Sequence, residues 1–248
     1  MLLIQVGKSI LNFGLIVVDM QNGFVSKGGS YDRLCMNIEN YQKVVHTIKQ
    51  LIDFCRDLQI PVFYTEAVRE PSGIDLLLNI HNILPRTREE RLEKIPICVR
   101  GTWDAQIIDE IKPTEKDHVV IKRRDSAFQD TELRVWLQSI GVNTLVFCGV
   151  DTSICVETSI RDAFNLGYDI VLISDATASG SGSHYATTLE RVRDYYGIVT
   201  HLQELNEIIK ILERIRSGGT GYNSNSGHKG EFLEKHNLID KSKYHIRN

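Results

Sequence analysis

Short, continuous runs of apolar residues recur along the chain and are typical of buried β-strands. Because these runs do not alternate with polar residues, each strand is expected to be covered on both faces, as in parallel sheets. The pattern predicts six strands, at residues 15–18, 60–64, 118–121, 144–148, 169–173 and 198–201.

The stretches between these strands carry apolar residues at intervals of three and four, which predicts amphipathic helices. We expect a helix that begins at Thr152 or Ser153, and others at residues 37–58, 102–111, 131–140, 184–196 and 205–215. Residues 66–100 contain several Pro and Gly and are expected to cross the ends of the strands. Strands that alternate with helices predict an α/β fold: a doubly wound, Rossmann-like parallel sheet of about six strands with helices on both faces.

The composition suits one large domain. The 248 residues are 42% apolar and carry a formal net charge of -3, so the charge gives no reason to expect nucleic acid or a membrane as a partner. A small-molecule substrate is the more natural ligand. We expect the domain to cover residues 1–216, and a flexible linker with a C-terminal tail to follow at 217–248, where the sequence is too polar to pack.

The five cysteines, at positions 35, 55, 98, 148 and 155, form neither a disulfide framework nor a Cys-x-x-Cys motif. This usage fits a reducing cytoplasm. Lys8 and Asn12 interrupt the apolar residues of the first segment, so we expect neither a signal peptide nor a membrane anchor.

Charged residues close two of the predicted strands. Asp19 follows the first strand and Lys122 the third, while the fourth turns sharply into the segment that contains Cys155. Taken singly, Asp19 is ordinarily a turn residue and Lys122 a solvated charge. In a doubly wound sheet, however, ligands bind at the carboxyl ends of the strands. The joint placement of these three residues therefore favours one shared site.

Cys155 is expected in the first turn of a helix, where unpaired N–H groups and the helix dipole favour the thiolate. The alternative is a small core residue, as most free cysteines are. In the catalytic interpretation, Asp19 takes the thiol proton, Cys155 attacks a carbonyl carbon, and Asp19 returns the proton to the departing nitrogen. The ammonium of Lys122 balances the charges of both.

Three motifs resemble the signatures of the isochorismatase-like cysteine hydrolase superfamily. They read Leu15-Ile-Val-Val-Asp-Met-Gln-Asn22, Lys122-Arg-Arg-Asp-Ser-Ala-Phe128 and Gly149-Val-Asp-Thr-Ser-Ile-Cys-Val-Glu-Thr-Ser-Ile-Arg-Asp-Ala163, within a match from about residue 12 to residue 205. The resemblance implies an Asp19–Lys122–Cys155 triad, a cis peptide between Val150 and Asp151, and an oxyanion hole formed by the amides of Asp151 and Cys155. Asp151 departs from the pattern, which usually has Ala or Thr; its carboxylate either points away from the site or recognises an amide or ammonium group of the substrate.

The branches of this superfamily differ in their chemistry. True isochorismatases act on a vinyl ether and lack the nucleophile, so Cys155 argues against that activity. Nicotinamidases carry a metal site with an Asp-x-His arrangement, whereas residues 64–69 contain no histidine; we therefore expect no metal and no cofactor. The remaining activities are those of ureidoacrylate, biuret and N-carbamoylsarcosine hydrolases, and residues 101–111 most resemble the ureidoacrylate and biuret branch.

Seven side chains flank the three strand ends and are candidates to line a substrate pocket, although packing or surface roles are as common for such residues: Gln21, Phe24, Glu66, Arg69, Trp103, Arg124 and Phe128. Arg69 and Arg124 are able to pair with a substrate carboxylate through a guanidinium fork. If neither does, an uncharged substrate such as biuret is favoured.

Three rival interpretations remain. A dinucleotide-binding protein would share the architecture, but the loop after the first strand lacks a Gly-x-Gly-x-x-Gly turn. A non-catalytic binding or assembly module would keep the fold without turnover. A redox role would pair Cys148 with Cys155, and the strand position of Cys148 makes it a poor resolving thiol. The resemblance also implies a homo-oligomer, a dimer or tetramer.

Overall fold

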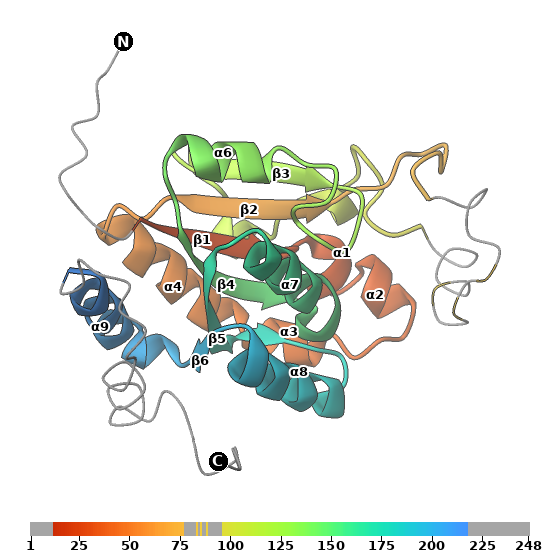
Figure 1. Cartoon of the computed structure of the whole chain (residues 1–248). Helices are drawn as coiled ribbons and strands as arrows, with labels where there is room; N and C mark the ends of the chain where they lie inside the picture. Colours follow the sequence, from red (N-terminus) through yellow and green to blue (C-terminus); the bar gives the residue numbers. More distant parts are fainter. Residues whose placement is uncertain (1–11, 77–82, 84, 86–87, 89–95, 218–248) are drawn as a thin grey trace.

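A computed structural model describes residues 12–76, 83, 85, 88 and 96–217. The predicted tail lies outside these residues beyond Ser217, and most of the segment from 77 to 95 lies outside them too (Figure 1). The boundary between domain and tail therefore stays a prediction. Within the described part, no helix is long and apolar enough to cross a membrane.

A six-stranded sheet runs through the middle of the described structure, in the order β3-β2-β1-β4-β5-β6. Every pair of neighbouring strands is parallel, which confirms the predicted fold class. The strands are β1 (Phe13–Val18), β2 (Val62–Ala67), β3 (His118–Lys122), β4 (Thr144–Val150), β5 (Asp169–Ala178) and β6 (Ile198–Thr200). The first strand, β1, lies in the middle of the sheet. The ends of β1 and β4 are therefore neighbours, and β2 separates β1 from β3.

Helices cover both faces of this sheet (Figure 1). One apolar cluster packs the sheet against α4 (Val45–Asp57) and α9 (Leu205–Ser217). The other packs the opposite face against α6 (Leu133–Ser139), α7 (Glu157–Asn165) and α8 (Gly182–Tyr195). Shorter helices near the strand ends are α1 (Asn22–Val25), α2 (Ser30–Arg33) and α3 (Glu39–Lys43), with the single turns η1 (Trp103–Ala105), η2 (Asp109–Ile111), η3 (Thr152–Val156) and η4 (Leu202–Glu204).

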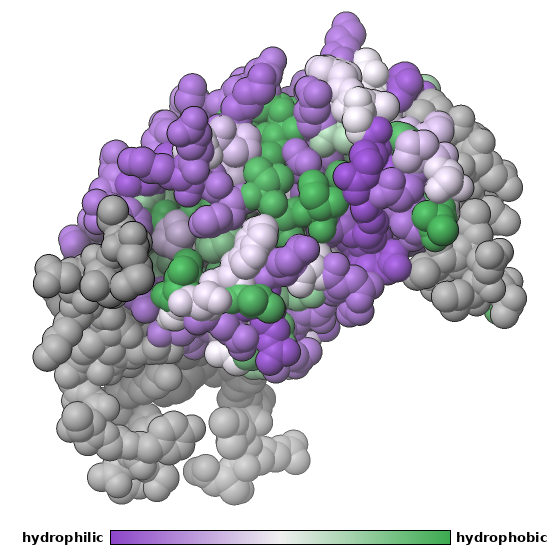
Figure 2. All heavy atoms as spheres, turned by 90° about the horizontal axis from the view of Figure 1, so that it is seen from above, coloured by the Kyte–Doolittle hydropathy of each residue, from purple (hydrophilic) through white to green (hydrophobic). Residues whose placement is uncertain are grey.

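The side of the molecule that carries α6 and β3 is mostly polar, with apolar atoms gathered towards its middle (Figure 2). Val119 on the edge strand and Val135 on α6 are among the exposed large apolar side chains. The predicted homo-oligomer is not tested by a single chain and stays a prediction.

The helix predicted at 102–111 is wrong. The segment forms two short 3₁₀ turns, η1 and η2, because its backbone is used by another part of the chain. The side chain of Gln21 donates to the carbonyl of Ala105 at 2.7 Å, and that of Asn22 donates to the carbonyl of Trp103 at 3.0 Å. The carbonyls that a helix would need are thus taken by residues that follow β1.

Other boundaries moved for local reasons. The helix predicted at 37–58 is interrupted at Val44 and becomes α3 and α4, an interruption of one residue to which apolar spacing is insensitive. Strand β2 is shifted towards its carboxyl end and includes Glu66, and β5 runs five residues beyond the predicted stop at Ile173. In both cases polar residues continue a strand after the apolar run has ended.

Candidate active site

Asp19 is held in place immediately after β1. Its backbone is left-handed, with φ of 49°, a conformation that aspartate tolerates better than most residues. The Thr65 hydroxyl, on β2, donates to Asp19 Oδ1 at 2.6 Å, and the Asp19 amide donates to the same hydroxyl at 3.1 Å. These contacts fix a carboxylate that is almost completely buried.

Lys122 brings a buried cation to this carboxylate. Its Nζ lies 2.8 Å from Asp19 Oδ2, and it donates to the carbonyls of Arg124 at 2.9 Å and Asp125 at 3.1 Å. Burial is the largest single influence and lowers the pKa of Lys122, but Asp19, Cys155 and Asp125 together outweigh it, so the pKa is raised. The lysine therefore stays charged inside the protein, where it donates to two backbone carbonyls and pairs with the Asp19 carboxylate.

The second carboxylate oxygen of Asp19 has different surroundings from the first. Asp19 Oδ2 is buried and, although close to Lys122 Nζ, accepts no well-aligned hydrogen bond among the described residues. The charge of Asp19 is one of the causes that raise the pKa of the Cys155 thiol, which places the thiol close to this carboxylate. The structure thus brings Asp19, Lys122 and Cys155 together, and their catalytic roles stay a prediction.

Cys155 lies in η3, a π-helical turn between β4 and α7, and is partly exposed. The expectation that a helix start favours its thiolate is wrong for the free protein. Burial raises the pKa of Cys155, Lys122 lowers it, and Asp19 raises it again, so the net shift is upward. The physical reason is that α7 begins only at Glu157, while desolvation acts on the thiol directly.

The turn after β4 contains a cis peptide between Val150 and Asp151, where the resemblance implied one. The N–H groups of Ile154 and Val156 both donate to the Asp151 carbonyl, at 3.2 and 3.1 Å, and close the turn. The predicted cap at Thr152 or Ser153 is wrong, because the cap is the Asp151 side chain, which accepts from the Ser153 amide.

The Asp151 carboxylate makes five contacts in all. Its Oδ1 accepts from the amide and hydroxyl of Ser153 and from the hydroxyl of Ser179, each at 2.8 Å. Its Oδ2 accepts from the Tyr41 hydroxyl at 2.8 Å and the Gly180 amide at 3.1 Å. Of the two alternatives, a carboxylate that points away from the substrate is the one that this geometry favours.

Three of the candidate pocket residues have packing roles in the structure. The amide of Gln21 is buried and bonds the backbone of Ala67 and Ala105, so it ties the end of β1 to β2 and η1. Phe24 packs edge-on against Tyr31, with ring centroids 4.8 Å apart. Phe128 faces Tyr168 at 6.0 Å, beside the second apolar cluster.

The two arginines proposed for a substrate carboxylate serve backbone carbonyls instead. Arg69 donates to the carbonyl of Arg123, and Arg124 donates to that carbonyl at 3.2 Å and to that of Asp75 at 2.9 Å. Trp103, in η1, is half exposed and makes its backbone contact with Asn22. None of these contacts is with the cluster around Cys155.

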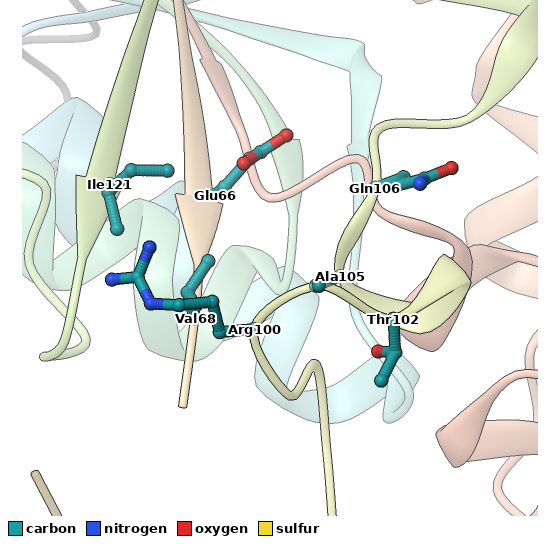
Figure 3. Close-up of a pocket in the computed structure, with 8 residues that line it drawn as sticks. Glu66, Val68, Arg100, Thr102, Ala105, Gln106 and Ile121 are labelled. Carbon is teal, nitrogen blue, oxygen red and sulfur yellow. The ribbon is translucent and has the colours of Figure 1, made fainter. Parts of the chain in front are cut away.

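Glu66 lines a pocket on the other face of β2. Residues that are register partners in parallel strands share a face, and Glu66 pairs with Ile121, whereas Ala67 pairs with Lys122. The pocket is lined by Glu66, Val68, Arg100, Gly101, Thr102, Ala105, Gln106 and Ile121 (Figure 3). Burial raises the pKa of Glu66, while the amide of Ile107 lowers it. This pocket is separate from the Asp19–Lys122 pair.

Sequence reasoning missed Arg88 and Asp125. Both nitrogens of the Arg88 fork face the two oxygens of Asp125, the residue whose carbonyl accepts from Lys122. Asp125 and Cys155 both raise the pKa of Arg88, which places the guanidinium near the thiol. Arg88 belongs to the charged run 86–94, where a single arginine carries no signal of its own. Thr65 was missed because a single threonine within a strand likewise carries no signal of its own.

Among the residues that the structure describes, no three His, Cys, Asp or Glu side chains are grouped so as to hold a metal ion. Cys148, the second thiol of the redox interpretation, is completely buried, with its Sγ 3.7 Å from the carbonyl of Ile16.

Residues 13–204 match the family model described as the isochorismatase domain, and the chain belongs to this family. Curated relatives include the ureidoacrylate amidohydrolase RutB of Methylobacterium radiotolerans, which is 30% identical over 211 residues and covers 82% of each chain. The RutB of Serratia proteamaculans is 34% identical over 197 residues, or 75% of this chain and 78% of the relative.

Solved structures agree with this assignment. An isochorismatase family protein from Desulfovibrio vulgaris has a TM-score of 0.70 and 27% identity, over 81% of this chain and 99% of its own. N-carbamoylsarcosine amidase from Thermoplasma acidophilum has a TM-score of 0.60 and 25% identity, over 77% and 96%. The resemblance seen in the three motifs, including the ureidoacrylate branch, is confirmed.

Proposed function

We propose that the protein is a cysteine amidohydrolase that cleaves a C–N bond of a small ureido or carbamoyl compound through a thioester intermediate. The observation that carries the proposal is the Asp19 carboxylate, which has one oxygen fixed by Thr65 and the other beside the Lys122 ammonium, and whose charge raises the pKa of the nearby Cys155 thiol. A hydrolase of amide C–N bonds also agrees with the names of the curated relatives.

In the first half of the reaction, Asp19 takes the thiol proton as the sulfur attacks the carbonyl carbon. A C–S bond forms, and the electron pair of the C=O bond moves to oxygen, where the amides of Asp151 and Cys155 are proposed to receive it. When this intermediate collapses, the C–N bond breaks, and Asp19 gives the proton to the departing nitrogen. The acyl group remains on Cys155 as a thioester.

Water completes the reaction. Asp19 takes a proton from the water as its oxygen attacks the thioester, the C–S bond breaks, and the thiol recovers its proton. The raised pKa of Cys155 fits a thiol that loses its proton during attack rather than beforehand. Lys122, held at 2.8 Å, stabilises the Asp19 carboxylate each time the carboxylate is regenerated.

Ureidoacrylate-like compounds are placed first because the curated relatives are named ureidoacrylate amidohydrolases. The arginines do not decide between a carboxylate-bearing and an uncharged substrate, since Arg69 and Arg124 donate to backbone carbonyls and the Arg88 fork is paired with Asp125. Biuret and N-carbamoyl amino acids of the N-carbamoylsarcosine type follow, and nicotinamide is last.

The reaction is proposed to be independent of metal, because residues 64–69 supply no histidine where nicotinamidases carry metal ligands. The test measures ammonia released by the purified protein from ureidoacrylate, biuret, N-carbamoylsarcosine and nicotinamide, with and without a chelator. We expect turnover of a carboxylate-bearing ureido compound that survives the chelator and is abolished by Cys155→Ala. Turnover of nicotinamide alone, or loss of turnover with chelator, would contradict the proposal.

A further inference from the structure

The Asp151 carboxylate has more hydrogen-bond donors than a surface cap requires. A helix N-cap ordinarily accepts from one or two backbone amides of its own turn. Here the oxygens also accept from the Ser179 hydroxyl and the Gly180 amide, which follow β5, and from the Tyr41 hydroxyl of α3. One side chain thus ties the turn after β4 to two other parts of the chain.

We infer that Asp151 is a positioning residue, whose carboxylate fixes the turn that presents the amides of Asp151 and Cys155 to the developing oxyanion. The inference rests on the proposed function, because that function gives the two amides their role.

The contacts require a carboxylate and not merely a polar side chain. Every one of the five partners is placed to donate, and each carboxylate oxygen accepts from a backbone amide: Oδ1 from Ser153 and Oδ2 from Gly180. A hydroxyl can rotate to become an acceptor, but a backbone N–H cannot. An asparagine in either orientation would therefore direct its NH₂ group at a backbone N–H.

The far end of the anchor is equally specific. Tyr41 is completely buried, and burial together with the charge of Asp151 raises its pKa, so its hydroxyl remains a donor. A Cβ added at Gly180 would lie 2.9 Å from the Tyr41 hydroxyl oxygen. Gly180 therefore allows the tyrosine to approach, and Gly180→Ala would strain the anchor from outside the turn.

Saturation by donors also explains how a negative charge is tolerated beside an oxyanion. An unpaired carboxylate would repel the developing charge. Five donors, from α3, from the turn itself and from the residues after β5, stabilise the negative charge of Asp151. The carboxylate is thereby used by the protein and not by an amide or ammonium group of the substrate.

Two reactions of the same thiol test this inference. Acylation of Cys155 by p-nitrophenyl acetate passes through an oxyanion, whereas alkylation by iodoacetamide displaces iodide from carbon without one. We expect Asp151→Asn and Asp151→Ala to lower the acylation rate about 100-fold, the effect of losing one oxyanion donor, and to leave alkylation within about threefold. Asparagine should be at least as damaging as alanine.

Matched controls are Asp57→Asn and Asp57→Ala, at an exposed position that ends α4, which should change neither rate. If the Asp151 variants do not fold, as judged by circular dichroism, Gly180→Ala decides, with a smaller loss of acylation alone. Equal rates in wild type and variants, or acylation and alkylation that fall together, would overturn the positioning role.

The two proposals fail in different ways. A wild-type protein that hydrolyses no ureido compound, but whose variants lose acylation selectively, would remove the proposed substrate and keep the role of Asp151. A wild-type protein that turns over a ureido compound, and whose variants lose nothing, would do the reverse. A Cys155 that neither reagent modifies would end both.

Discussion

Asp19 and Asp151 follow neighbouring strands, yet their surroundings are opposite. The Asp19 carboxylate has a hydroxyl donor on one oxygen and an ammonium beside the other, which accepts no well-aligned hydrogen bond among the described residues. The Asp151 carboxylate has five donors on two oxygens. A carboxylate with a spare oxygen is able to carry a proton, and one whose oxygens are saturated holds structure.

The backbone supports the same distinction. Asp19 is in the left-handed region, which turns its side chain towards Thr65 on β2, whereas Asp151 is extended, with φ of -76° and ψ of 135°, and caps the turn that follows. The number and kind of donors around each oxygen therefore distinguish the two carboxylates at this edge of the sheet. The following experiments test whether that difference marks the proposed catalytic residue.

The largest effect is expected from Asp19→Asn, which keeps the shape and tolerates the left-handed backbone. An amide cannot take up and return the thiol proton, so kcat for the ureido substrate should fall at least about a thousandfold. Initial rates measured beside Cys155→Ala check this. A loss of kcat below tenfold would show that Asp19 does not transfer the proton and that, like Asp151, it has a positioning role.

Lys122→Met should have the largest effect on stability. It leaves the buried Asp19 charge without its cation, so the free energy of unfolding should fall by about 3–5 kcal/mol. Urea denaturation at neutral pH measures this, with the exposed Lys112→Met as control. Adding Asp19→Asn to Lys122→Met should recover part of the loss, and a purely additive double variant would contradict the pairing.

The pH dependence of Cys155 alkylation should show the raised pKa. Because burial raises the pKa of Cys155, the rate should still be rising above pH about 8.5, where a free thiol is half ionised. Lys122 lowers this pKa, so Lys122→Gln should move the profile to higher pH. Iodoacetamide kinetics from pH 6 to 10 test both, and a plateau below pH 8 would favour a preformed thiolate.

The smallest effect is expected from Thr65→Val, which removes the hydroxyl that fixes Asp19 Oδ1. The loss of one buried hydrogen bond should lower the free energy of unfolding by about 1–2 kcal/mol. Thr65→Ser keeps the hydroxyl and is the matched control, with both variants compared in urea melts. Equal midpoints for Val and Ser would show that Oδ1 is held by other contacts.

The sequence predicted the sheet and the meeting of Asp19 with Lys122, because apolar runs locate parallel strands and strand ends converge at one edge. It did not predict the partners of Asp151, because Tyr41 and Gly180 reach it only through the packing of α3 and β5. Apolar spacing likewise could not show that residues 102–111 give up their carbonyls to side chains after β1. Local patterns record burial, whereas such contacts depend on distant parts of the chain.

The strand order sets a length that the lysine has to match. Because β2 lies between β1 and β3, Lys122 reaches Asp19 across two strand spacings, about 9–10 Å in total. A stem of four methylene groups suits that span, and the register partner that lies below it on β2 is Ala67, which has no side chain beyond Cβ. The small size of residue 67 therefore helps to keep the ion pair in contact: a leucine there would increase the distance between the Lys122 ammonium and the Asp19 carboxylate without changing the charge of either group.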